Sequence, residues 1–217
     1  MRFNVEGLFI KIAGITNEED ALFAIGLGAS AVGFDFGVSP RQIAPAAAHD
    51  IIRRLPQGAL SIGSFRNELP QRVVEIASTL GLSAVQLEGA MTSDQVAYVS
   101  ERVNTVLRLT SPEAGPGAAG IDYLVLPDDD DAFALNASLE HFARSSTRHP
   151  VVASGGLDGA NVVDIVQNYP VFGVEARSGV ERSPGQKDPV QLGQFIANAR
   201  WAYENSLVER HFDEWQV

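Results

Sequence analysis

The chain has 217 residues, 45% of them hydrophobic, with a formal net charge of −11 and no cysteine. It is long enough to bury one sizeable core, so we expect a single domain over residues 1–217. The acidic charge argues against nucleic acid and against a membrane as partners, and the lack of cysteine excludes disulfides and thiolate chemistry. Residues 1–6 lack the apolar core of a signal peptide, and no apolar run reaches membrane-spanning length, which indicates a cytoplasmic protein.

Short apolar runs alternate with helical segments along the whole chain. Asn17 is a typical helix N-cap, and the three acids after it suit the positive end of a helix dipole. Eight alternations of strand and helix predict a closed parallel (β/α)8 barrel, or TIM barrel. In chain order we expect strands at 8–13, 31–36, 59–64, 84–87, 105–109 and 123–126 and in 150–157 and 171–181, and helices from Asn17, at 45–55, at 69–80, from Ser93 and at 188–205.

One unit of this repeat is irregular. Residues 110–120 contain three glycines and two prolines, too many for a full helix. We therefore expect a degenerate fifth helix, either missing or a single turn. The barrel can still close, because closure comes from hydrogen bonds between the strands.

Two strands near the C-terminus end in turns of small residues. Gly155-Gly156 follows the first, and Ser178-Gly179 follows the second, where we expect a short helix to begin. Glycine lets a phosphate approach backbone N–H groups, and a helix N-terminus attracts its charge. Each turn alone is more simply an ordinary loop. Together, after strands seven and eight, Gly155, Gly156, Ser178 and Gly179 predict a phosphate cradle.

Several motifs resemble those of the phosphoribosylanthranilate isomerase family, in the same order along the chain. They are KIAGITNEEDA at 11–21, AVGFDF at 31–36 with SPR at 39–41, AVQLEG at 84–89, SGGL at 154–157, and SGVE at 178–181 with SPGQKD at 183–188. The resemblance implies a (β/α)8 barrel of tryptophan biosynthesis and a small anionic phosphorylated substrate. It also implies an Amadori rearrangement, which opens the ribose ring of N-(5'-phosphoribosyl)anthranilate and moves a proton without metal or cofactor.

The catalytic groups of that family are altered here. The reaction needs an acid at the ring oxygen and a base at C2. The resemblance places the family's cysteine base at Ala13, which cannot take a proton. It places the family's aspartate acid at Pro127, although Asp128 can serve if the strand end shifts by one residue. Alternatively, residues 128–131 form a solvated acidic loop.

Other positions differ from the family as well. Glu88 replaces a histidine on strand four, and Glu175 replaces an aspartate on strand eight. Arg177 replaces a serine beside the phosphate turn, and Arg66 stands where a small apolar residue is usual. The combined changes of base, acid and nearby loop indicate natural divergence. We take Glu88 as a candidate substrate-binding residue and Glu175 as a candidate catalytic carboxylate.

Three further charged residues are candidates for the site. Lys11 shares a strand face with Ala13, so it should point into the barrel and need an acidic partner, Asp35 or Glu175. The alternative to a substrate-binding lysine is a structural ion pair. Asp35 sits where a barrel strand normally carries an apolar residue, which makes it our favoured replacement base. Arg41 can bind a substrate carboxylate or phosphate bidentately, or form a surface ion pair.

Three functions remain open. The first is an isomerase of this family, acting on phosphoribosylanthranilate or a close phosphosugar amine, with acid and base drawn from Asp128, Asp35 and Glu175. The second is a paralogue with another reaction on a related anionic substrate. The third is a non-catalytic barrel that binds a phosphorylated metabolite or a protein. The motifs favour the first, whereas loss of a general base, which costs about 10²–10⁴-fold in rate, favours the others. The oligomeric state is not predicted.

Overall fold

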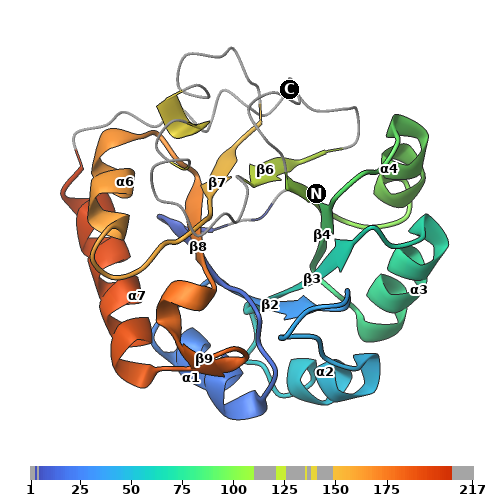
Figure 1. The fold of residues 1–217 in the computed structure, drawn as a ribbon, viewed down its shortest axis with the longest axis horizontal. Helices are drawn as coiled ribbons and strands as arrows, with labels where there is room; N and C mark the ends of the chain where they lie inside the picture. Colours follow the sequence, from blue (N-terminus) through green and yellow to red (C-terminus); the bar gives the residue numbers. More distant parts are fainter. Residues whose placement is uncertain are drawn as a thin grey trace.

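Eight parallel strands close into a barrel, in which each strand pairs with its neighbours in chain order and β8 pairs back to β1 (Figure 1). The structure, a computed structural model, describes residues 3, 5–109, 121–125, 135, 138–140 and 149–206. The predicted (β/α)8 barrel is confirmed, including the pairing of the fifth strand with the fourth and sixth. The strands are β1 (Phe9–Ile12), β2 (Ala31–Asp35), β3 (Leu60–Arg66), β4 (Ala84–Glu88), β5 (Val106–Leu109), β6 (Tyr123–Val125), β7 (Val151–Ala153) and β8 (Gly173–Ala176).

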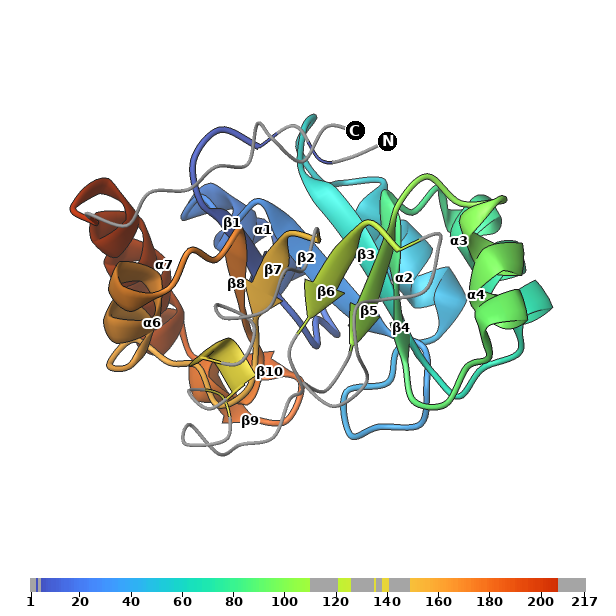
Figure 2. The same ribbon diagram turned by 90° about the horizontal axis from the view of Figure 1, so that it is seen from above.

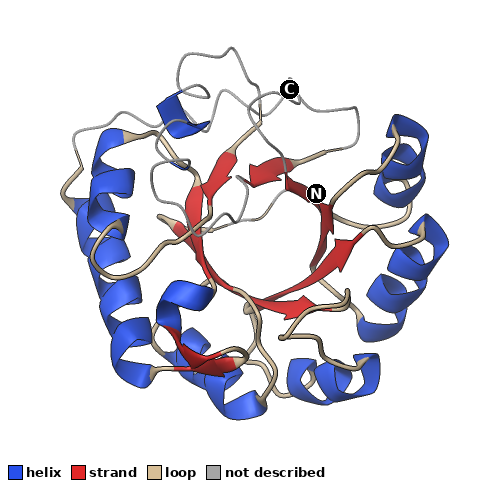
Figure 3. Cartoon of the chain, in the orientation of Figure 1, coloured by secondary structure: helices blue, strands red, loops and turns tan. Residues whose placement is uncertain are grey.

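Helices surround the ring of strands on its outside (Figure 3). The Asn17 side chain accepts a hydrogen bond from the Asp20 N–H at 2.8 Å and so caps α1, and Gly81 ends α3 in a left-handed conformation with φ 63°. Within the described residues, no helix is both long and apolar enough to cross a membrane. The helices whose bounds are described are α1 (Glu18–Gly26), α2 (Pro45–Ile52), α3 (Pro70–Leu80), α4 (Ser93–Ser100), α6 (Val162–Asn168) and α7 (Pro189–Glu204).

Some element ends differ from the expectation. β3 continues to Arg66, because that residue is the register partner of Glu88 on β4. α2 ends at Ile52 and is followed by turns of the 3₁₀ type. There the N–H groups of Arg54 and Leu55 donate to the carbonyls three residues earlier in the chain. The expected degenerate fifth helix, at 110–120, lies outside the described residues.

A hairpin that the sequence did not predict follows β8. The expected short helix, η2 (Ser178–Val180), is present, and β9 (Glu181–Ser183) then pairs with β10 (Gln186–Lys187). Seen from the side, both strands lie beyond the end of β8 (Figure 2). The hairpin therefore stands at the carboxyl ends of the barrel strands, where sites in such barrels form.

The barrel interior is apolar toward the amino ends of the strands. Four aromatic rings close that end, with centroids 4.9 to 5.5 Å apart; they belong to Phe3, Phe9, Tyr123 and Phe172. Their packing leaves the opposite, carboxyl end for polar groups. The inward-facing apolar side chains are Phe9, Ala31, Ile62, Ala84, Leu107, Tyr123, Val125 and Val152.

Candidate active site

Polar side chains replace this apolar packing toward the carboxyl ends of the strands. Lys11 is fully buried, and its Nζ donates to Glu175 Oε2 and to Gln86 Oε1, each at 2.6 Å. Lys11 and Glu175 are register partners on β1 and β8. Gly33 leaves room for the lysine stem, since a methyl group there would lie 2.9 Å from Lys11 Cε. The acidic partner of Lys11 is therefore Glu175 and not Asp35.

This ion pair continues as a chain of hydrogen bonds across the barrel. Ser154 Oγ donates to Glu175 Oε1 at 3.3 Å, so both carboxylate oxygens of Glu175 have partners. On the other side, Gln86 Nε2 donates to Glu88 Oε1 at 3.2 Å, and Arg66 Nη2 lies 2.9 Å from Glu88 Oε2. Glu175 and Glu88 are both buried, and each has a polar partner at both of its carboxylate oxygens.

Asp35 is also buried, but the shortest polar contact of its carboxylate is longer than the shortest contacts of Glu175 and Glu88. Ser39 Oγ donates to Asp35 Oδ2 at 3.2 Å, and Arg177 Nη1 lies 3.9 Å from the same oxygen. Burial raises the pKa of Asp35; the Arg177 guanidinium opposes this rise, and the negative charge of Glu88 adds to it. Asp35 therefore keeps a proton at a higher pH than an ordinary aspartate, one strand away from Ala13.

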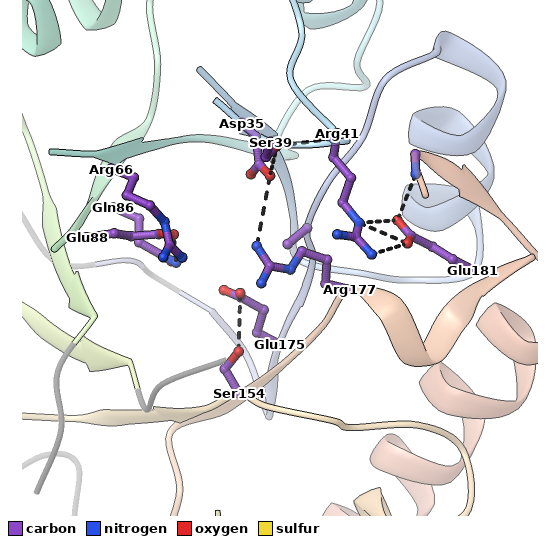
Figure 4. Close-up of polar contacts among 12 residues, drawn as sticks. Asp35, Ser39, Arg41, Arg66, Gln86, Glu88, Ser154, Glu175, Arg177 and Glu181 are labelled. Carbon is purple, nitrogen blue, oxygen red and sulfur yellow. Dashed lines mark hydrogen bonds and ion pairs between the residues drawn. The ribbon is translucent and has the colours of Figure 1, made fainter. Parts of the chain in front are cut away.

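Arg41 forms an ion pair within the chain. Its Nε lies 3.0 and 2.9 Å from the two oxygens of Glu181, and its Nη2 lies 2.7 Å from Oε2 (Figure 4). Lys187 Nζ donates to Glu181 Oε1 at 2.8 Å, and to the carbonyls of Ala13 at 2.6 Å and Arg177 at 3.3 Å. A substrate-binding role for Arg41 stays a prediction, because its bidentate partner here is internal.

Arg41, Glu181 and Lys187 form one cluster, whose charges shift the pKa values of Glu181 and Lys187. Burial acts to raise the pKa of Glu181, but the hydrogen bond from Arg41 and the charge of Lys187 outweigh it, so the pKa is lowered. Burial lowers the pKa of Lys187, and Glu181 opposes that change. Through these contacts the cluster joins the ends of β1 and β8 to the loop after β2.

The two small-residue turns lie against each other. Gly155 and Gly156 have φ values of 103° and 58°, which favour glycine. A methyl group on Gly179 would collide with the carbonyl oxygen of Leu157, so no side chain fits between the turns. Ser178 begins η2, as expected. This arrangement is compatible with the predicted phosphate cradle, which stays a prediction.

A pocket of about 230 Å³ opens where these charged side chains meet. Figure 4 shows Arg177 reaching from the end of β8 toward Asp35. The pocket brings together Asp35, Arg41 and Glu88 from the predicted site, whereas Lys11 and Glu175 do not line it. Its described lining residues are Asp35, Gly37, Val38, Ser39, Pro40, Arg41, Ser64, Arg66, Glu88 and Arg177.

The predicted acid cannot be placed. Asp128, Pro127 and the acidic run at 128–131 all lie outside the described residues.

Sequence reasoning missed the roles of four residues in this network. Gln86 and Ser154 point inward with Glu88 and Glu175, so strand alternation was the available signal for them. Glu181 and Lys187 come from the hairpin, whose charged strands show no apolar alternation. Its Pro-Gly pair at 184–185 is a turn signal that could have located it.

The fold and the site together define a class: a (β/α)8 barrel with a pocket of paired charges at the carboxyl ends of its strands. Comparison with known proteins narrows the class to a family. The family model for N-(5'-phosphoribosyl)anthranilate (PRA) isomerase matches residues 10–198. The chain belongs to that family, as its motifs indicated.

Individual relatives agree with this result. The N-(5'-phosphoribosyl)anthranilate isomerase of Citrifermentans bemidjiense is 38% identical over 200 residues, which cover 88% of this chain and 96% of the relative. The crystal structure of the phosphoribosyl anthranilate isomerase of Thermotoga maritima is 31% identical, with a TM-score of 0.79 over 89% of this chain and 99% of that one. Another solved phosphoribosyl anthranilate isomerase, 34% identical with a TM-score of 0.78 over 89% and 99% of the two chains, is in complex with reduced 1-(o-carboxyphenylamino)-1-deoxyribulose 5-phosphate.

Proposed function

We propose that the protein carries out the Amadori rearrangement of a phosphoribosyl-amine such as N-(5'-phosphoribosyl)anthranilate. The observation that carries the proposal is the family match over residues 10–198. The relative in complex with a reduced, phosphorylated aminodeoxyribulose supports a ligand of the same kind here. The proposal requires no metal or cofactor and includes a single domain and a cytoplasmic location.

The phosphate of the substrate binds between Gly155-Gly156 and Ser178-Gly179. Backbone N–H groups and the start of η2 are the groups that an anion needs, and none of them depends on a particular side chain. The close packing of Gly179 on the Leu157 carbonyl supports this arrangement, because it holds the two turns together. The sugar then extends from the turns toward the pocket.

Asp35 takes the C2 proton. An acid first protonates the ring oxygen, the C1–O bond breaks, and a protonated imine forms at C1. Removal of the C2 proton then gives an enolamine, which becomes the ketone. Glu175 is the other candidate base, but both of its oxygens already accept hydrogen bonds, one from Lys11 and one from Ser154. Asp128 is the proposed acid.

Two observations favour a second function. Ala13 stands where the family carries its base, and the Arg177 side chain extends into the mouth of the barrel beside Asp35. A paralogue that performs another reaction on a related anionic substrate, or a barrel that only binds a phosphorylated metabolite, fits such a change.

Complementation of a tryptophan auxotroph that lacks this isomerase distinguishes the isomerase from the second function. Growth with the wild-type gene, lost with Asp35→Asn, supports the isomerase and its base. Absence of growth with a well-expressed wild-type protein supports the second function. Growth restored equally by Asp35→Asn removes Asp35 from the mechanism, and growth restored equally by Asp128→Ala removes Asp128.

A further inference from the structure

The side chain of Arg177 connects two parts of the candidate site. Arg177 stands directly after β8 and directly before Ser178, where η2 begins. Its guanidinium lines the pocket, and Nη1 lies 3.9 Å from Asp35 Oδ2 (Figure 4). One residue therefore adjoins both the predicted phosphate cradle and the proposed base.

The fold holds Arg177 in this place from two sides. Lys187 Nζ donates to the Arg177 carbonyl at 3.3 Å and to the Ala13 carbonyl at 2.6 Å, which ties the ends of β8 and β1 together. Gly14 leaves room for the arginine stem, since a methyl group there would lie 3.4 Å from Arg177 Cγ. The Arg177 side chain is only 18% exposed. Its guanidinium is therefore part of the mouth of the barrel and not a loose surface group.

Charged groups surround Asp35 on several neighbouring elements. They are Lys11 on β1, Arg41 in the loop after β2, Arg66 on β3, Glu88 on β4 and Arg177 after β8.

Three of these cations have other carboxylates close to them. Lys11 lies 2.6 Å from Glu175, Arg66 lies 2.9 Å from Glu88, and Arg41 contacts Glu181 through two nitrogens. Among the ion pairs of the described residues, the cation that Asp35 meets is Arg177.

A carboxylate has to be ionised before it can take a proton from carbon. Burial raises the pKa of Asp35, the charge of Glu88 adds to the rise, and the guanidinium of Arg177 opposes it more strongly than any other group. Arginine keeps its charge at neutral pH even where it is largely buried. The Arg177 cation therefore increases the fraction of molecules in which Asp35 is a base.

We propose that Arg177 is a positioning residue for the proposed base, whose guanidinium keeps the Asp35 carboxylate ionised at the mouth of the barrel. This inference rests on the proposed function, in which Asp35 removes the C2 proton. It joins two departures from the family pattern: Ala13 has lost the proton acceptor, and Arg177 brings a counter-charge to another one.

The charge of Asp35 can be measured without a substrate. NMR of protein with ¹³C-carboxyl-labelled aspartate follows the titration of Asp35, whose signal is the one missing from Asp35→Asn. Arg177→Met removes the cation and keeps a long side chain. It is expected to raise the proton affinity of Asp35 about tenfold, because an opposite charge this close shifts a carboxyl by at least that much.

Two further variants complete the titration. Arg177→Lys keeps a cation and is expected to restore most of the wild-type titration. Arg182→Met, which removes an exposed arginine of β9, is the matched control and should leave the titration of Asp35 unchanged. If Arg177→Met does not fold, Arg177→Gln takes its place, since it also removes the charge.

The pH profile of kcat/KM with N-(5'-phosphoribosyl)anthranilate tests the role in the reaction. In Arg177→Met the acid limb of the profile is expected to move to higher pH, with a loss of about tenfold on that limb, because the base is protonated there. Above the limb, the variant should approach the wild type, and Arg177→Lys should lie close to the wild type throughout.

Three results overturn the inference alone. They are an unchanged titration of Asp35 in the neutral variant, an equal shift in Arg182→Met, and a loss of activity that is the same at every pH. The last result would indicate a structural or substrate-binding role for Arg177. Wild-type protein without isomerase activity overturns the proposed function and the catalytic part of the inference with it. The NMR titration, which needs no activity, separates the two failures.

Discussion

Arg41 and Glu181 are joined by three N–O contacts of 2.7 to 3.0 Å, although 140 residues separate them in the sequence. The same carboxylate binds the buried Lys187, so one negative charge compensates two positive ones. This sharing makes Glu181 a critical residue for stability at the mouth of the barrel.

Glu181→Gln is expected to lower the free energy of unfolding by about 3 kcal/mol, because it removes the negative charge that the largely buried Arg41 and Lys187 share. Unfolding in urea measures the change. The matched control is Glu75→Gln, whose partner Arg72 and whose own side chain are exposed on α3; it should cost no more than about 0.5 kcal/mol. Similar losses in the two variants would contradict the importance of the buried cluster.

Lys11→Met is expected to cost about 3 kcal/mol of stability, because Glu175 is then a buried carboxylate without its ammonium partner. The double variant Lys11→Met/Glu175→Gln should cost clearly less than the sum of the two single changes, since it removes both charges. Urea unfolding of the four proteins gives this coupling. Additive losses would mean that the ion pair contributes nothing to folding.

Asp35→Asn is expected to become more stable relative to the wild type as the pH rises. Because burial raises the pKa of Asp35 above the ordinary value of 3.8, the folded state holds this proton more tightly than the unfolded state does. The stabilising contribution is present below 3.8 and is lost as the pH rises through the raised pKa. Asparagine does not titrate there. Stability curves of both proteins from acid to neutral pH measure the difference, and a constant difference argues against the shift.

Phe9→Ala is expected to lower the free energy of unfolding by about 3–5 kcal/mol, because the ring is fully buried among the aromatic groups that close the barrel.

Tyr123→Phe is expected to lower the free energy of unfolding by about 1 kcal/mol, because it removes the hydroxyl that accepts a hydrogen bond from the Phe3 N–H at 2.8 Å. Thermal unfolding compares both variants with Phe23→Ala, whose ring is 41% exposed. A larger loss in that control would refute the ranking.

Inorganic phosphate or ribose 5-phosphate is expected to bind between the two small-residue turns. Ser178→Asp should abolish this binding, since it sets a negative charge at the start of η2. Gly179→Asp is a poorer test, because any side chain there meets the Leu157 carbonyl. Gly193→Ala, in open space on α7, is the control. Isothermal titration decides: no binding by the wild type at millimolar phosphate, or equal binding by Ser178→Asp, argues against the cradle.

The barrel could be predicted from the sequence because parallel strands buried on both faces are nearly continuous apolar runs. The burial of Lys11 and Asp35 followed from strand alternation in the same way. The partner of Lys11 could not be predicted in this way. Whether Lys11 meets Asp35 or Glu175 depends on the register between β1 and β8, which joins residues 164 positions apart.

The hairpin after β8 shows a second limit of sequence reasoning. Its strands are short and charged, so they lack the alternation by which a strand is recognised. The partner of Arg41 comes from this hairpin, and the sequence therefore left its bidentate contact open between a ligand and an internal carboxylate.

The main chain at position 13 is fixed without help from its side chain. The Ala13 N–H donates to the Ala176 carbonyl at 2.9 Å, and the Ala13 carbonyl accepts from Lys187 Nζ at 2.6 Å. The strand end therefore keeps its place whatever side chain it carries. Both contacts involve main-chain atoms of Ala13 alone, so a different side chain at this position leaves them in place and does not require the barrel to be rebuilt.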